Sequence, residues 1–158
     1  MFRFLEITPE LLRAHAISRR QALELAGLTG LESALLPSEF VAERMLPMAE
    51  NEGWIGFWIL ENASGDVIGS GGYKSLPVDG VVEIGYGIDE SFWGQGAATV
   101  LCAELVRHAF AQGEQVVRAH TLEDGIASQR VLAKNGFGFV GKFIEPEDGE
   151  VLRFERTQ

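Results

Sequence analysis

The sequence predicts an α+β fold, in which a mixed but mostly antiparallel twisted sheet is flanked by helices. Three stretches between residues 54 and 88 are rich in aromatic and β-branched residues and are separated by turn residues, a pattern typical of an antiparallel meander. On either side, segments with helical periodicity alternate with short strand-like runs, which indicates helical crossovers mixed with strands. A length of 158 residues fits one domain, residues 1–158.

The N-terminal part is predicted to hold one strand and two helices. Arg3–Ile7 alternates as a short strand. A helix follows from Pro9 to about Leu25, because Thr8 is a suitable N-cap and proline is favoured at the first helical position. The glycines expected to end this helix are Gly27 and Gly30.

The second helix is expected after Leu35–Pro37, with Ser38 as its N-cap. Its apolar stripe consists of Val41, Met45 and Met48, and its end is expected at residues 51–53. Six further strands are expected, at Trp54–Glu61, Val67–Leu76, Val81–Ile88, Val116–Thr121, Phe137–Ile144 and Val151–Arg156. Two further helices are expected, at Gly94–Gln112 and Ile126–Asn135. The complete order is therefore β-α-α-β-β-β-α-β-α-β-β.

Composition and charge exclude some classes of function. A formal net charge of −10 argues against nucleic-acid binding, which needs a basic surface, and either favours cationic partners or only keeps the protein soluble. No apolar run approaches the roughly 20 residues that span a bilayer, and the N-terminus does not resemble a signal peptide, so we expect a cytoplasmic protein. The single cysteine, Cys102, is expected to be a small core residue.

The loop Trp93–Ala98 is the first candidate binding site. It carries Gly94 and Gly96 around Gln95, followed by the small residues Ala97, Ala98 and Thr99 at the predicted start of a helix. No capping side chain precedes Gly94, so the first backbone N–H groups of the helix are free to bind a phosphate or diphosphate. The spacing also resembles a dinucleotide-binding fingerprint, but the preceding antiparallel meander disfavours that interpretation.

The strand before this loop is the second candidate. Its residues alternate between an apolar face, with Val82, Ile84, Tyr86 and Ile88, and a face with Glu83, Gly85 and Gly87. Glycine within a strand marks a bulge or a close approach by a backbone or ligand. The preceding strand also carries such residues, namely Gly69, Gly71 and Gly72. We expect a ligand along this strand end; the alternative is a bulge with Glu83 merely exposed.

Two segments resemble the GNAT N-acetyltransferase superfamily, and most closely the branch of ribosomal-protein N-terminal alanine acetyltransferases. They are VEIGYGIDESFWGQGAAT, residues 82–99, and ASQRVLAKNGF, residues 127–137. The order of elements also matches, and the resemblance is good over residues 54–144. It implies an acetyl-CoA-dependent N-acetyltransferase that acts on a protein N-terminus or a small amine, as a monomer or homodimer, without a metal ion.

The resemblance also implies where acetyl-CoA binds. Its pyrophosphate would lie on the N–H groups of Gly94 to Thr99, and Trp93 belongs to the same cofactor-binding loop. Its pantetheine would pair like an extra strand with Tyr86, Gly87 and Ile88, where the two middle strands of the family separate. The late helix would contribute Ser128 and Arg130. Arg130 and Lys134, four residues apart on this helix, either meet the adenosine 3′-phosphate or form a solvated face.

Glu83 is the predicted catalytic base, because an ammonium substrate must lose a proton and Glu83 lies on the ligand-facing side of its strand. The alternative role is an anion that binds the substrate. His120 is a second candidate base, although a lone histidine at a strand end is usually a surface residue. His15 and His108 are expected to face solvent, and Trp54 and Trp58 to line either the core or the acceptor pocket.

The sequence departs from the family in three places. The loop has no cationic side chain, the common CoA-contacting asparagine is Gly125, and the usual tyrosine that protonates the departing thiolate is Leu132. Tyr73 and Tyr86 are the alternative candidates for that acid. These departures leave open a catalytically silent acyl-CoA-binding module. The acceptor is expected to contact the N-terminal helices and the last hairpin.

Overall fold

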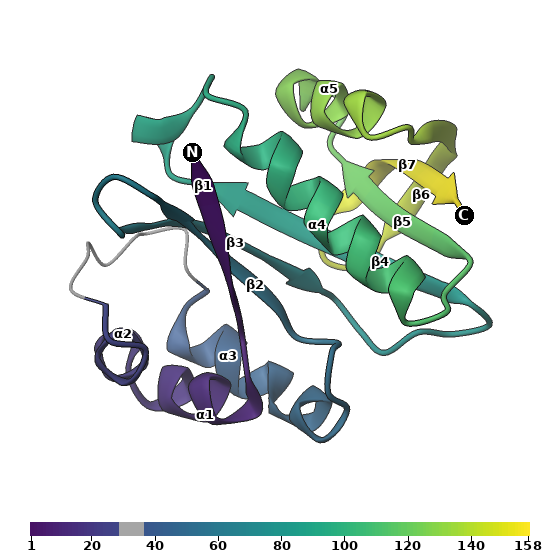
Figure 1. Cartoon of the computed structure of the whole chain (residues 1–158). Helices are drawn as coiled ribbons and strands as arrows, with labels where there is room; N and C mark the ends of the chain where they lie inside the picture. Colours follow the sequence, from purple (N-terminus) through teal and green to yellow (C-terminus); the bar gives the residue numbers. More distant parts are fainter. Residues whose placement is uncertain (29–36) are drawn as a thin grey trace.

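The computed structural model, which describes residues 1–28 and 37–158, confirms the α+β fold (Figure 1). One sheet holds seven strands in the order β1-β2-β3-β4-β5-β7-β6, and every neighbouring pair is antiparallel except β4–β5. The strands are β1 (Phe2–Glu6), β2 (Gly56–Glu61), β3 (Val67–Tyr73), β4 (Val81–Ile88), β5 (Val116–Thr121), β6 (Gly138–Glu145) and β7 (Gly149–Thr157). The helices are α1 (Pro9–Ile17), α2 (Arg19–Leu25), α3 (Glu39–Met45), α4 (Ala97–Ala111) and α5 (Ile126–Lys134), with short 3-10 turns η1 (Leu46–Glu50) and η2 (Glu90–Phe92).

The sheet is covered on both faces, as Figure 1 shows, with α1, α2 and α3 on one side and α4 and α5 on the other. The core under α4 includes Leu101 and Leu105 packed with Ile84 of β4. The core under α1 includes Leu11 and Trp58, which is fully buried. Trp58 is thus a core residue, and Cys102 is buried against the sheet, as expected.

The first predicted helix is not continuous, because it is broken at Ser18. Ser18 has an extended backbone (φ −161°, ψ 130°), ends α1 and begins α2. Its hydroxyl accepts a hydrogen bond from the Gln21 N–H, so a side-chain cap replaces the continuous helical ladder. Gly27, expected to end the helix, follows α2 with a left-handed φ of +72°. Gly30, the second glycine expected there, and Leu35, expected to lead into the next helix, lie outside the described residues.

The second predicted helix also ends early. Ser38 caps α3 by accepting the Val41 N–H, as expected, but the chain tightens into η1 at Leu46. Pro47 lacks the N–H that would donate to a carbonyl one helical turn earlier, which favours this change. The third departure is β3, which ends at Tyr73 and not at Leu76.

The glycines of β3 accommodate neighbouring backbone. A Cβ atom on Gly69 would lie 2.4 Å from the Gly87 carbonyl oxygen, and one on Gly72 would lie 2.3 Å from the Ile55 carbonyl oxygen. The expectation that a ligand explains these glycines was therefore wrong for Gly69 and Gly72.

The two middle strands separate along β4. Val81–Ile84 pairs with Val116–Ala119 of β5, whereas Gly85–Ile88 continues to pair only with β3 within the described chain. The second half of β4 therefore has an open edge facing β5. The Ile88 carbonyl at this edge accepts a 2.8 Å hydrogen bond from the indole Nε1–H of Trp93. This bond ties the open strand end to the loop that follows it.

Candidate active site

A cavity of about 540 Å³ lies where β4 separates from β5. Its walls are the end of β4, the loop after η2, the start of α4 and one side of α5. Eleven of the twelve residues predicted to bind the cofactor line it, namely Tyr86, Gly87, Ile88, Trp93, Gly94, Gly96, Ala97, Ala98, Thr99, Ser128 and Arg130. Gln95 is absent from the lining, and Lys134 is part of it. Tertiary structure thus brings the two predicted segments to one site.

The loop before α4 owes its shape to two glycines. Gly94 and Gly96 have φ values of +77° and +82°, a left-handed conformation that residues with a Cβ atom rarely adopt. Gly96 is the N-cap of α4, and no described side chain caps this helix end. The helix begins at Ala97, so the predicted start at Gly94 was three residues early. The N–H groups of its first turn lie at the cavity and are available to an anion.

Tyr86 is the tyrosine that faces this cavity. Its hydroxyl lies 3.2 Å from the Ser128 hydroxyl of α5, and burial raises the pKa of the phenol to about 12. The phenol is therefore protonated at neutral pH. The Tyr73 hydroxyl instead donates a 2.7 Å hydrogen bond to the Leu105 carbonyl in the core, so it is not available as an acid. Leu132, at the family's tyrosine position, is fully buried.

A second cavity, of about 650 Å³, opens on the face that carries α1 to α3. Its walls include the apolar side chains of Val41, Met45 and Met48. It shares Tyr86 and Gly87 with the first cavity, so the two cavities meet at the open end of β4 from opposite faces of the sheet. Neither Trp54 nor Trp58 belongs to the lining of either cavity.

Charged side chains stand around this second cavity. Arg44 of α3 and Glu147 of the β6–β7 turn both line it and lie 3.8 Å apart, so this ion pair joins the N-terminal helices to the last hairpin. Lys74 also lines it, and its Cε would lie 3.1 Å from a Cβ placed on Gly85. The cavity therefore combines an apolar wall with two cations and one carboxylate.

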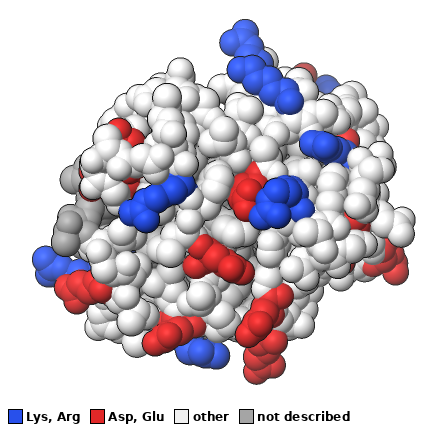
Figure 2. Space-filling model, in the orientation of Figure 1, with Lys and Arg blue, Asp and Glu red and all other residues white. Residues whose placement is uncertain are grey.

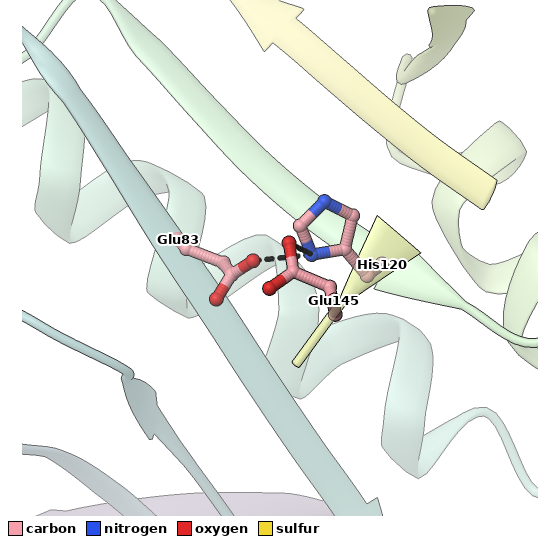
Figure 3. A group of neighbouring side chains, drawn as sticks. All are labelled: Glu83, His120 and Glu145. Carbon is pink, nitrogen blue, oxygen red and sulfur yellow. Dashed lines mark ion pairs between the residues drawn. The ribbon is translucent and has the colours of Figure 1, made fainter. Parts of the chain in front are cut away.

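The carboxylate of Glu83 contacts Nδ1 of His120 on the neighbouring strand β5 (Figure 3). The His120 side chain is only 7 % exposed, so the expectation of a surface histidine was wrong. Arg153 of β7 donates from Nε to Nε2 of His120 over 2.9 Å. Glu145 of β6 completes the group at 3.8 Å from both His120 Nδ1 and Arg153 Nη2. Figure 3 shows both carboxylates pointing to the same edge of the imidazole ring.

Three residues of this group, Glu83, His120 and Glu145, each offer one atom that could bind a metal ion. These atoms lie within 4.8 Å of one another, close enough for one metal ion to contact all three. A metal on Nδ1 would need the lone pair of that nitrogen. Because the Arg153 guanidinium can only donate, Nε2 of His120 must accept and Nδ1 must carry the ring proton. This tautomer follows from the hydrogen-bond network, and it fits a hydrogen bond to Glu83 better than a metal ligand.

Arg153 and Glu145 were missed in the sequence analysis. The sheet register pairs His120 with Arg153, but only because β7 lies between β5 and β6. The amino-acid sequence of a hairpin does not indicate which of its two strands will lie next to the rest of the sheet and which will form the edge. The alternation along Val151–Arg156 would have placed Arg153 on one strand face without identifying its partner.

The two remaining histidines are not at the surface as expected. His15 is buried and donates a 2.7 Å hydrogen bond from Nε2 to the Pro37 carbonyl, and burial lowers its pKa. His108 is half-buried and donates from Nε2 to the Gly53 carbonyl over 2.6 Å. His108 also contacts the ring of Trp54, which packs edge-on against Tyr73 in the core. Both histidines therefore have structural roles, joining their helices to the chain that follows α2 or precedes β2.

The family of the chain follows from its match to a protein-family model. A family model described as an acetyltransferase (GNAT) domain matches residues 22–138. The chain belongs to the GNAT acetyltransferase family. The chain is therefore an N-acetyltransferase of this family. In this family context, the two meeting cavities are candidates for the cofactor and acceptor sites.

Individual relatives agree with this assignment. The chain is 34% identical over 101 residues to the FsC-acetyl coenzyme A-N(2)-transacetylase of Aspergillus fumigatus, a match that spans 63% of this chain and 40% of that relative. It is similar to the ribosomal-protein-S5-alanine acetyltransferase of Vibrio fischeri, with a TM-score of 0.71, 17% identity, and coverage of 99% of this chain and 92% of that one. It is also similar to the aminoglycoside acetyltransferase AAC(6′)-Ib in complex with coenzyme A, with a TM-score of 0.67, 20% identity, and coverage of 100% and 95%.

The surface adds two observations. Acidic and basic side chains are interspersed on the face that Figure 2 draws, and no continuous basic patch forms there among the described residues. None of the helices in residues 1–28 and 37–158 has the length and apolar character needed to traverse a membrane.

Proposed function

We propose that this GNAT acetyltransferase transfers the acetyl group of acetyl-CoA directly to a primary amine, with Glu83 as the base that removes the amine proton. The observation that carries the proposal is the meeting of two cavities at Tyr86 and Gly87, on opposite faces of the sheet. A thioester in the first cavity and an amine in the second would face each other there. Holding two reactants in this way supplies much of the rate of a bimolecular reaction.

The first cavity suits acetyl-CoA. The pyrophosphate would lie on the N–H groups of the first turn of α4, with Arg130 and Lys134 near the adenosine 3′-phosphate. The pantetheine would pair with the open edge Gly85–Ile88 as an added strand. The name of the Aspergillus relative and the coenzyme A complex of the aminoglycoside enzyme support this choice of cofactor.

The chemistry follows from these positions. The amine nitrogen attacks the thioester carbonyl, a backbone N–H near Ile88 stabilises the developing oxyanion, and the carbon–sulfur bond then breaks. Tyr86, protonated at neutral pH, would donate its proton to the departing thiolate. The free CoA thiol is acidic enough that this donation need not be strong.

Glu83 would act through water. It precedes Gly85 by two residues on the same strand face, about 7 Å along β4, and it is outside the described lining of both cavities. A proton can reach a base through one bridging water molecule. The contact with His120 Nδ1 holds the carboxylate in place for this transfer.

The acceptor is a protein N-terminus or a small amine. The apolar wall of Val41, Met45 and Met48 favours an amine attached to an apolar group. Arg44 and Lys74 disfavour a second positive charge, so polyamines are poorer candidates than monoamines. This cavity preference differs from the attraction for cations expected from the net charge alone.

The test is an acceptor screen with acetyl-CoA that follows CoA thiol release and the mass increase of one acetyl group. We expect acetylation of at least one monoamine or peptide N-terminus, and Glu83→Gln should lower kcat by roughly 100-fold while CoA still binds. An unchanged rate in Glu83→Gln rules out the base. Tight CoA binding without acetylation of any amine would instead favour the catalytically silent acyl-CoA-binding module.

A further inference from the structure

We propose that Arg153 is a positioning residue for proton transfer: it fixes His120 in the tautomer whose Nδ1–H holds the carboxylate of Glu83. This inference rests on the proposed role of Glu83 as base. Within the described residues, Arg153 forms no ion pair with Glu83 and is not part of the lining of either cavity, so it acts through His120. The chain of contacts runs across three adjacent strands, β4, β5 and β7.

The direction of each bond is decided by the chemistry of the groups. Arg153 Nε lies 2.9 Å from Nε2 of His120, and a guanidinium has donors but no acceptor. Nε2 must therefore be the unprotonated ring nitrogen. In a neutral imidazole the proton is then on Nδ1, where it points to the carboxylate oxygen of Glu83.

Arg153 is itself held in place, which it must be if it is to orient another side chain. Its guanidinium stacks on the Phe143 ring at 3.6 Å from the centroid, and Nη2 lies 3.8 Å from Glu145. The side chain is 17 % exposed. A planar guanidinium that is stacked and paired presents its Nε–H in a fixed direction.

The opposite tautomer would disrupt the site. With the proton on Nε2, His120 would turn a hydrogen towards the Arg153 Nε–H and a lone pair towards the Glu83 carboxylate. Both contacts would be repulsive, and Glu83 would lose its donor. Among the described residues, the charged groups that face His120 are Glu83 from β4, Glu145 from β6 and Arg153 from β7. The carboxylates disfavour this tautomer at Nδ1, and the guanidinium disfavours it at Nε2.

The experiment reads the tautomer directly. The chain has three histidines, and long-range 1H–15N correlation spectra of the whole protein at pH 8.5, well above the ordinary histidine pKa of about 6.5, report the protonated nitrogen of each. We expect the Nδ1–H form for His120 in the wild type. In Arg153→Met, where only the carboxylates still favour Nδ1–H, we expect a mixture that contains the Nε2–H form, and a kcat/KM lower by roughly 10- to 100-fold with CoA binding retained.

Arg107→Met is the control. It also removes one arginine that pairs with a glutamate, Glu104, but on α4 and outside the described lining of either cavity. It should change neither the His120 tautomer nor kcat/KM by more than about threefold, the effect of a lost surface ion pair. Equal effects of Arg107→Met and Arg153→Met would overturn the proposal, as would an Nε2–H tautomer in the wild type.

A double-mutant cycle separates positioning from folding. The amide nitrogen of asparagine can donate to Glu83 as Nδ1–H does, without a tautomer to fix. In the His120→Asn background, adding Arg153→Met should therefore lower kcat/KM by a smaller factor than it does in the wild type. An equal decrease of kcat/KM in both backgrounds would mean that Arg153 does not act through His120. The tautomer is measured without substrate, so a failed acceptor screen would contradict the proposed function and leave this result standing.

Discussion

The hydroxyl group of Tyr86 lies 3.2 Å from the hydroxyl group of Ser128. The first residue is on β4 and the second on α5, so this contact crosses the cavity between the open strand end and the late helix. It places the phenol, protonated because burial raises its pKa to about 12, beside the predicted path of the pantetheine. The family's own tyrosine position cannot serve, since Leu132 has no proton to donate and is fully buried in the core.

Tyr86→Phe should therefore lower kcat by roughly 10- to 100-fold, at or below the low end of the range for general acids, because the CoA thiolate is a good leaving group. The Kd of CoA, measured by calorimetry, should change by less than about threefold, under 1 kcal/mol. Ser128→Ala, which removes only the partner hydroxyl, should have a smaller effect. A kcat unchanged in Tyr86→Phe would show that the thiolate leaves without this acid.

Gly96→Leu should abolish CoA binding, since the side chain would occupy the space in front of the first turn of α4. Gly113→Leu is the control: both glycines have left-handed φ values, +82° and +98°, and neither would crowd a Cβ atom against described atoms. Both variants should lose about 1 to 2 kcal/mol of stability in denaturant unfolding. Only Gly96→Leu should weaken CoA binding by more than about tenfold. Gln95→Ala, outside the cavity lining, should bind CoA almost normally; the reverse pattern would contradict this account of the loop.

Arg44→Ala and Glu147→Ala should each alter the KM of the acceptor while leaving the Kd of CoA unchanged. Both side chains line the second cavity and are 64% and 80% exposed, so their pair should contribute less than about 1 kcal/mol to stability. Steady-state kinetics with the best acceptor of the screen gives the measurement. If both variants leave the acceptor KM unchanged, the second cavity is not where the acceptor binds.

His15 should make folding stability depend on pH. Burial lowers its pKa, so the unfolded chain binds the proton more readily than the folded chain. Stability is then fully present above the unfolded pKa of about 6.5 and falls as the pH drops through that value towards the folded pKa. Urea unfolding at pH 7.5 and pH 5.5 measures the change. His15→Gln, whose amide can still donate to the Pro37 carbonyl, should lose less stability over this interval than the wild type.

Much of the first cavity could be predicted from sequence because its parts are local. The alternation along Val81–Ile88 fixes which side chains share a face, and the structure buries Val82, Ile84 and Ile88 as that alternation requires. The glycines of the Trp93–Ala98 loop determine its left-handed turns within a few residues. The predicted order of elements was confirmed for the same reason. The exception is the break at Ser18, where the serine hydroxyl caps α2 and the first predicted helix does not continue through this residue.

The sequence by itself determined the α+β fold, the glycine-bearing loop and the strand that carries Glu83, because these depend on backbone preferences and periodicities spanning a few residues. Only the tertiary structure decided that β7 lies between β5 and β6, that Arg153 therefore reaches His120, and that His120 meets Glu83 in a nearly buried contact. Strand order and burial result from packing the whole sheet, where contacts between residues far apart in sequence outweigh any local preference.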